Sequence, residues 1–485
     1  MTLSASLSSA LSGLTAASRA AEVVSSNVAN AMTEGYGRRE VSLSARMIGR
    51  TGNGVMVNGV VRMTNMVAVG DRRLADAGLG DTSMRAAFYR TLEASLGLPD
   101  DGNSLSGRIS AFDAALISAA SRPDSEARLS QVTDAARNMA ARLVSASKEV
   151  QASRSRADDQ IEAQVAQLNT TLKRVAELNV EIRAMAGGGR DASALMDQRQ
   201  QAIDQISAIV PLREIPRDMG TVALVTATGA MLLDGAPAEV GFTPVGVIAP
   251  GMTMASGALF GITLNGRAVD VAGANSPIAG GSLAANFAIR DVLGVEAQAK
   301  LDAIARDLVE RYQDPAVDPT LAPGQAGLFT DLGSAFDPAN EVGLAQRLRL
   351  NALVDPQQGG ELWRIRDGLG AAAPGAVGDS TLLTALQAAL NANREPASGG
   401  FMTGARSFSV LAGDYISNVA TQRLSAESDT SFAQGKTDAL RMIELEDGVD
   451  TDAEMQKLLL IEPAYSANAK VVQLVDEMIK TLIGI

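Results

Sequence analysis

The sequence contains no cysteine and no histidine among its 485 residues. Without cysteine the chain can form no disulfide, carry no thiolate nucleophile and offer no Cys ligand to zinc. Without histidine it lacks the commonest general base and the commonest transition-metal ligand, so a Ser-His-Asp triad is impossible. We therefore expect no catalytic residue, no cofactor and no metal site, although chemistry based on carboxylates, Lys, Arg, Ser or Tyr stays open.

Aromatic residues, positive charge and long apolar runs are also scarce. Aromatics make up 3 % of the chain, with one Trp, which suits slender helical packing better than a wide ligand pocket. The net charge of −13 lacks the basic footprint of a nucleic-acid binder and disfavours anionic membranes. No apolar run reaches the roughly 18 residues of a transmembrane helix, and residues 1–7 do not resemble a secretory signal peptide. We expect no nucleic-acid or membrane partner, and export, if it occurs, by another route.

The first thirty residues predict an amphipathic helix with a heptad seam. Apolar side chains alternate by steps of four and three: Leu3, Leu7, Ala10, Leu14, Ala17, Ala21, Val24, Val28 and Ala31. A seam of this period packs against another helix. Serine fills many outward positions and gives only modest helix propensity, so we expect this helix to need a partner.

The last segment repeats the pattern with Ile461, Tyr465, Asn468, Val472, Val475, Ile479 and Leu482. Asn468 has two interpretations: it faces solvent at an imperfect turn, or it fixes the register of a coiled coil. Pro463 removes one helical hydrogen bond, so we expect a bend or break near residues 461–463 and a partner helix that begins in earnest only beyond it. Chain ends fray unless they are tied down, and these two matched seams therefore predict that the ends pair with each other.

The middle of the chain predicts a helical body with one β-rich interruption. An apolar stripe from Leu129 to Met185, after a start signal at Pro123, predicts a rod of about sixty residues, roughly 90 Å long. Further helices are expected near 84–97, 105–120, 191–210, 285–312, 342–353, 360–368, 380–392 and 404–445. Glycine punctuates residues 32–80, which predicts an irregular loop with a short hairpin. Residues 211–290 are rich in Gly, Val, Thr and Pro and predict a small β insertion.

The predicted fold is therefore mainly α, elongated and multi-domain. Its terminal helices pair as a coiled coil, its body is a long-helix bundle, and a small β-rich insertion interrupts that body. The predicted domains are a terminal domain of residues 1–83 plus 447–485, a helical body of 84–210 plus 291–446, and an insertion of 211–290.

A short motif follows the first seam. Asn27, Asn30, Thr33, Gly35 and Tyr36 match the Asn-x-Ala-Asn and Thr-x-Gly-Tyr or Thr-x-Gly-Phe pattern of flagellar axial proteins, a family that the chain resembles. Tyr36 followed by Arg38, where rod and hook proteins usually have Phe and then Lys, is similar to the hook-associated members at the hook–filament junction. Residues 195–199 resemble the Leu-x-Asp-Gln-Arg helix of those members, and residues 448–454 with 465–470 resemble the shared C-terminal motif. Glu34, Gln200 and Pro463 depart from the family's usual Pro, Asp and Gln.

The resemblance implies a structural subunit of the bacterial flagellum, not an enzyme, that acts as junction adaptor between hook and filament. The terminal domain would form the inner tube. The implied assembly interface consists of Leu3, Leu7, Leu14, Val24, Val28, Ile461, Tyr465, Asn468, Val472, Val475, Ile479 and Leu482. Implied partners are further copies in a tubular ring, the hook protein below, a second hook-associated junction protein and the filament above, and an export chaperone. The implied location is the extracellular flagellum, reached by type III export without a cleaved signal peptide.

Two alternatives remain open. The chain could be a hook or distal-rod subunit, or, more remotely, a secreted enzyme carried on an axial scaffold with its activity in residues 211–290. A local basic set also has two interpretations: Arg38, Arg39, Arg46, Arg50 and Arg62 either belong to a solvated loop or contact acidic neighbours in an assembly.

Overall fold

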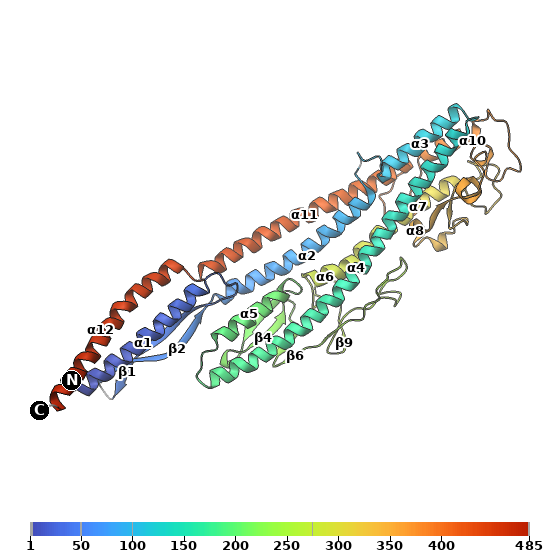
Figure 1. Ribbon diagram of the computed structural model, residues 1–485. Coiled ribbons are helices and arrows are strands. Elements are labelled where there is room, and N and C mark those ends of the chain that lie inside the picture. Colours follow the sequence, from blue (N-terminus) through green and yellow to red (C-terminus); the bar gives the residue numbers. More distant parts are fainter. Residues whose placement is uncertain (1–2, 49–50, 99, 274, 484–485) are drawn as a thin grey trace.

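The computed structural model describes residues 3–48, 51–98, 100–273 and 275–483, and shows an elongated molecule (Figure 1). Both chain ends lie at one end of the molecule, and the short elements around α10 lie at the other. The fold is mainly α, with long helices and few small sheets, as the sequence predicts.

The terminal part of the molecule consists of two helices and a hairpin. Helix α1 (Leu3–Ala29) lies against α12 (Thr451–Ile483) and against the antiparallel strands β1 (Arg38–Ile48) and β2 (Thr51–Met63). The hairpin predicted within residues 32–80 is present but longer than expected, since it fills 38–63, and the irregular loop expected around it is wrong, because α2 (Met66–Leu96) begins directly after the hairpin. Asn65 caps α2, since its side-chain oxygen accepts from the backbone N–H groups of Val67 and Ala68.

Helix α12 passes through Pro463 without a break, contrary to the predicted interruption, and begins twelve residues before that proline. The missing proline N–H leaves the carbonyl of Leu459 without its helical donor. Pro463 and Leu459 are both exposed, so water can bond that carbonyl and the helix continues.

The body is built around one very long helix. Helix α4 (Glu126–Gly187) has 62 residues, about 93 Å of rise, and confirms the predicted rod. Helices α2 and α11 (Phe408–Glu446) lie side by side and connect the terminal part to the body (Figure 1). At the far end, α3 (Leu105–Ser121), α7 (Gly294–Gln313) and α10 (Thr381–Asn391) pack with α4 around Phe112, Tyr312 and Phe329.

Arg154, which interrupts the apolar stripe of α4, is fully buried. Its guanidinium donates to the carbonyl oxygens of Arg290 at 2.7 Å and Met252 at 2.6 Å. Burial lowers the pKa of Arg154 to about 10. One turn further along α4, Asp158 pairs with Arg290 at 2.6 Å. Arg154 and Asp158 therefore bind two other segments to α4: residues 249–252 and the π-turn at Ile289–Leu293.

Small sheets line one side of α4. Strands β3 (Leu212–Pro216), β4 (Val222–Thr226), β5 (Met231–Asp234) and β6 (Ala236–Pro237) form one sheet, and β7 (Val240–Gly241), β8 (Thr263–Leu264) and β9 (Arg267–Ala268) form another. They share a core with α4, α5 (Ser193–Ser207) and α6 (Ser282–Ala288) that includes Leu172, Ile203, Leu224 and Phe287.

The remaining elements are short. Two expected helices, at 342–353 and 360–368, are only the four-residue α8 (Leu344–Arg347) and α9 (Arg364–Asp367), because glycines with positive φ at 343, 359 and 368 interrupt the chain. Strand β10 (Phe329–Asp331) pairs with β11 (Leu348–Leu350). The other turns are η1 (Asp218–Gly220), the π-turn η2 (Ile289–Leu293), η3 (Pro338–Asn340), η4 (Ala352–Val354) and η5 (Pro356–Gln358).

Candidate assembly site at the chain termini

The two terminal helices pack along an apolar seam. Val24 of α1 and Val475 of α12 are both 5 % exposed, and the seam residues Ala10 and Ala17 of α1 are also buried. In α12 the only other buried residue among those described is Glu454. α1 is therefore more completely buried than α12, in part because it also packs against β1 and β2.

The predicted interface residues fall into three groups. Val24 and Val475 are buried; Leu7, Leu14, Val28, Ile461, Asn468, Val472 and Ile479 are half-buried; Leu3, Tyr465 and Leu482 are exposed. A single chain thus brings these residues together but leaves much of their apolar surface in contact with water. Apolar area of this kind favours association at roughly 25 cal/mol per Å² buried.

Asn468 lies at the contact with α1. Its side-chain amide donates to the carbonyl of Ala464 in its own helix at 2.8 Å. A Cβ placed on Gly13 would lie only 2.8 Å from the Asn468 amide, so Gly13 provides the space that Asn468 occupies. The side chain is half-buried, and among the described residues of α1 none forms a hydrogen bond with it.

The motif residue Asn27 ties three elements together. Its side-chain oxygen accepts from the Arg39 backbone N–H and the Tyr36 hydroxyl, both at 3.0 Å. Its amide nitrogen donates to the Arg39 carbonyl at 2.8 Å and to the Glu454 carboxylate at 2.9 Å. Asn27 is fully buried and uses both ends of its amide, which an Asp or Leu of similar size could not do.

The other motif residues shape the turn after α1. Asn30 donates from its side chain to the Ser26 carbonyl at 2.9 Å, and the Thr33 backbone N–H donates to the Asn30 carbonyl at 2.9 Å. Gly35 has φ +76°, a conformation that favours glycine. The Arg39 guanidinium lies 4.8 Å from the centre of the Tyr36 ring. Arg38 pairs with Glu40 at 2.6 Å.

Asp197, in the segment that resembles Leu-x-Asp-Gln-Arg, binds this turn to the body. Its carboxylate accepts from the Gly37 backbone N–H at 3.0 Å, from Arg39 at 2.8 Å and from Arg62 at 2.7 Å. Arg62 also donates to Gln200, where the family usually has Asp. Arg38, Arg39 and Arg62 of the basic set are therefore engaged within the chain, Arg46 is exposed, and Arg50 lies outside the described residues.

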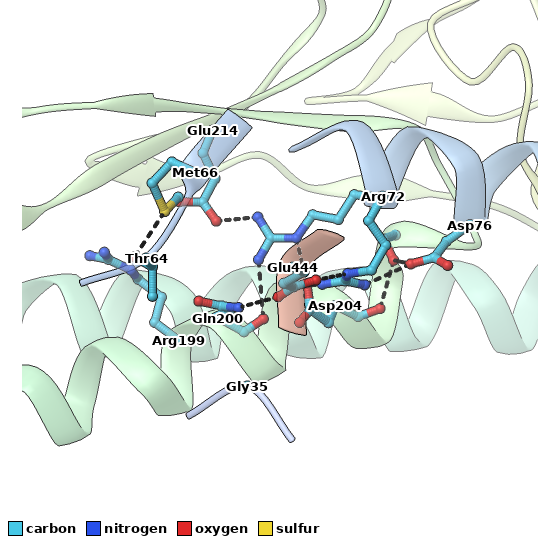
Figure 2. A network of polar contacts seen from close by, with 12 residues as sticks. Gly35, Thr64, Met66, Arg72, Asp76, Arg199, Gln200, Asp204, Glu214 and Glu444 are labelled. Carbon is cyan, nitrogen blue, oxygen red and sulfur yellow. Dashed lines mark hydrogen bonds and ion pairs between the residues drawn. The ribbon is translucent and has the colours of Figure 1, made fainter. Parts of the chain in front are cut away.

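A second polar cluster lies between α2, α5 and α11 (Figure 2). Arg72 contacts Asp76 at 2.7 Å, Asp204 at 2.9 Å and Glu444 at 2.5 Å. The neighbouring Arg73 pairs with Asp204 at 2.5 Å and with Glu214 of β3. Burial acts to lower the pKa of Arg72, but the charges and hydrogen bonds of Asp204 and Glu444 outweigh it and raise the pKa above its usual value. The arginine therefore stays charged.

This cluster could not be found from the sequence. Arg72, Arg73 and Asp76 are buried in a stretch for which glycine spacing predicted a loop, and their partners lie far away along the chain. The paired arginines followed by an aspartate one turn later were the only local signal.

Among the residues with described positions, no group of three or more acidic side chains could hold a metal ion. None of the helices in that part of the chain is long and apolar enough to cross a membrane.

Three family models match the chain. The helical domain of flagellar hook-associated protein FlgK matches residues 91–314, the flagella basal body rod protein matches 7–36, and the C-terminal region of flagellar basal body rod FlgEFG proteins matches 447–485. The two terminal matches fall on α1 and α12, and the long match falls on the body around α4.

Curated relatives agree with these matches. Flagellar hook-associated protein 1 of Salmonella typhimurium is 29 % identical over 49 % of this chain and 44 % of that protein. The protein of the same name from Bacillus subtilis is 23 % identical over 99 % of this chain and 97 % of its own length. The match to the enteric relatives thus spans less than half of their length. A solved structure, the flagellar hook junction protein FlgK from Burkholderia pseudomallei, aligns with 54 % of this chain and 46 % of that one at 19 % identity and a TM-score of 0.43.

Paired terminal helices on a long helical body, with axial-protein matches at both ends, define an axial structural protein of the bacterial flagellum. Within that class, the similarity to the FlgK helical domain and to curated flagellar hook-associated protein 1 sequences supports a hook-associated junction protein. The resemblance inferred from residues 27–38 and 195–199 is thereby confirmed.

Proposed function

We propose that the protein is a structural junction subunit between hook and filament, which assembles by burying its terminal helices against neighbouring copies. The observation that carries this proposal is the half-closed seam between α1 and α12, in which Leu3, Tyr465 and Leu482 are 37, 43 and 63 % exposed. A monomer with such surface is soluble at net charge −13 and gains stability when the surface is covered.

The twelve seam residues named from the sequence are the proposed assembly interface. Asn27, Asn30, Thr33, Gly35, Tyr36 and Arg38 form the proposed joint that fixes the terminal helices to the hairpin. We retain the three-part division into residues 1–83 plus 447–485, 84–210 plus 291–446, and 211–290 as a proposal. In this division, α2 runs across the boundary between residues 83 and 84, and the insertion of residues 211–290 shares its core with α4 and α5.

The proposed partners follow from the position in the flagellum. They are further copies in a tubular ring, the hook protein on one side, and a second hook-associated junction protein and the filament on the other. We further propose export through the flagellar type III channel without a cleaved signal peptide, after delivery by a cytoplasmic chaperone. The location is then extracellular, at the hook–filament boundary.

A hook or distal-rod subunit is the weaker candidate, because the body matches the hook-associated helical domain. We also propose that the chain is not an enzyme. Residues 211–290 share their core with α4 and α5, so a peptidase and glycosidase assay should use the whole chain, and turnover by it would contradict this.

Deletion of residues 472–485 tests the assembly mechanism. The deletion removes Val475, Ile479 and the rest of the C-terminal seam but none of the body core, so we expect a folded body and no filament attachment. Circular dichroism of the purified chain checks the fold, and electron microscopy of cells that carry the variant counts filaments.

The matched control is Lys480→Ala, which removes an exposed ion pair with Asp476 in the same segment and should leave filaments normal. Normal filaments on cells with the deletion would refute the terminal-helix mechanism.

A further inference from the structure

Helix α12 carries a second apolar stripe beside its seam with α1, and the two share only Leu482. Its members follow steps of seven, four, three, four and four: Leu460, Ala467, Val471, Leu474, Met478 and Leu482. All are exposed, and the five larger side chains are 40–73 % exposed. At about 100° per residue, this stripe lies roughly a quarter turn around the helix from the seam positions. Six apolar side chains in one row on a helix surface require a partner that a single chain does not supply.

A groove on the other helix offers such a partner surface. Ser4, Leu7, Ser8, Leu11 and Thr15 of α1 line it together with Val55–Val57 of β2. The Val55 backbone N–H donates to the Ser12 hydroxyl at 3.1 Å, so the strand lies directly on the helix and closes the floor of the groove. The serines are small and allow a helix to approach closely, while Leu7 and Leu11 provide apolar contact.

The chain's own α12 cannot fill this groove. Gly13 marks the face of α1 that contacts α12, because Asn468 covers it. Ser4, Ser8, Leu11 and Thr15 lie roughly 140–180° around the helix from Gly13, on the opposite side. The stripe of one chain can therefore contact the groove only of another copy of the chain.

The two surfaces match in spacing, size and charge. An antiparallel arrangement places Leu482 beside Ser4, Met478 beside Ser8, Leu474 beside Leu11 and Val471 beside Thr15, and both sets span about 16 Å. Long side chains thereby meet serines at two of the four positions, Leu482 beside Ser4 and Met478 beside Ser8. The exposed Arg46 at the groove and the exposed Glu477 beside the stripe carry opposite charges.

We propose that the face of α12 formed by Val471, Leu474, Met478 and Leu482 docks into the α1–β2 groove of a second copy of the chain, antiparallel to its α1. This inference rests on the proposed function and specifies its subunit contact. Each copy then presents one stripe and one groove, so the contact is head-to-tail and repeats from copy to copy, as a ring or helical tube requires.

The absence of cysteine from the chain allows a direct test by cross-linking. Cells produce two single-cysteine variants together, Ser8→Cys and Met478→Cys, and isolated hooks with their junctions are oxidised. A disulfide forms only where Cβ atoms approach to about 3.5–4.5 Å. We expect dimers that contain one copy of each variant. The matched control is Ser8→Cys with Lys480→Cys, whose side chain points roughly 160° away from that of Met478, and we expect at least tenfold fewer dimers.

A second pair of variants tests the same contact with the same two cysteines, Ser8→Cys and Met478→Cys. Leu474→Glu, added to the Met478→Cys chain, places a charge inside the proposed contact and should lower the dimer yield at least tenfold. Gln473→Glu adds the same charge at the neighbouring exposed position, outside the stripe, and should leave the yield unchanged.

The outcomes separate this inference from the proposed function. Wild-type chain present at the hook tip, with filaments attached but with equal Ser8/Met478 and Ser8/Lys480 dimer yields, would overturn the docking and leave the junction function intact. Wild-type chain absent from the hook tip would overturn both.

Discussion

At the scale of single residues, Asp197 connects the terminal part to the body. Its side chain is 10 % exposed, and it receives two arginines and one backbone N–H from the turn and hairpin after α1. Hydrogen bonds to a charged group contribute more than neutral ones, and loss of one partner leaves the others buried and unpaired. Asp197 therefore fixes the turn and hairpin to α5.

Asp197→Asn removes the charge while it keeps the side-chain shape. We expect the free energy of unfolding to fall by about 1.5–3 kcal/mol, because Arg39 and Arg62 lose their charged acceptor. Urea denaturation of the purified chain measures this. Asp476→Asn, in an exposed pair with Lys480, is the control and should change stability by less than about 1 kcal/mol. Equal effects of the two substitutions would contradict the role given to Asp197.

Asp302 in the body predicts a pH dependence. Burial raises the pKa of Asp302 to about 6, although hydrogen bonds from Ala345, Gly343 and Gln298 act to lower it. The folded chain thus holds this proton more tightly than the unfolded chain does. The contribution of protonated Asp302 to stability is present below its ordinary pKa of 3.8 and is lost as the pH rises to about 6.

Comparison with Asp302→Asn isolates this effect from other titrating groups. We expect the unfolding free energy of the wild type, relative to that of the variant, to fall by about 2 kcal/mol between pH 4 and 6. Denaturation midpoints measured across that range check the prediction. A difference that stays constant with pH would show that Asp302 has its ordinary pKa.

At the scale of elements, the sequence predicted those helices whose apolar residues recur at a regular spacing. The apolar pattern of α4 continues far enough to predict a helix of about sixty residues, and the observed helix has 62. The terminal seams predicted that α1 and α12 pack together. Helix α2 was placed only from residue 84, because Gly70, Gly78 and Gly80 and the buried Arg72 and Arg73 disturb its apolar spacing. The bonds of Asp197 join residues more than 130 positions apart, and no local pattern encodes such pairs.

Helices α1 and α12 should be the least protected long helices in the free subunit. α12 buries only Glu454 and Val475, whereas α4 buries residues along its whole length. Few buried contacts mean a low free energy of local opening. We expect fast amide hydrogen exchange at residues 3–29 and 460–483 of the purified monomer and slow exchange in α4. Slow exchange at both termini would mean that the ends already form a stable pair in solution.

At the scale of the whole molecule, the chain combines a well-packed helical body with terminal helices that are only partly buried. The body has an extensive apolar core of its own, while the terminal part is joined to it largely through ion pairs and hydrogen bonds at Asp197, Arg72 and Arg73. Assembly can therefore complete the terminal part and leave the body unchanged.

Imaging of the hook–filament boundary at a resolution that shows helices tests the central claim most directly. The account predicts that α1 and α12 of every copy lie together in the innermost layer, packed against neighbouring copies, with the body outside them. Terminal helices on the outer surface, or without contact to neighbouring subunits, would contradict it.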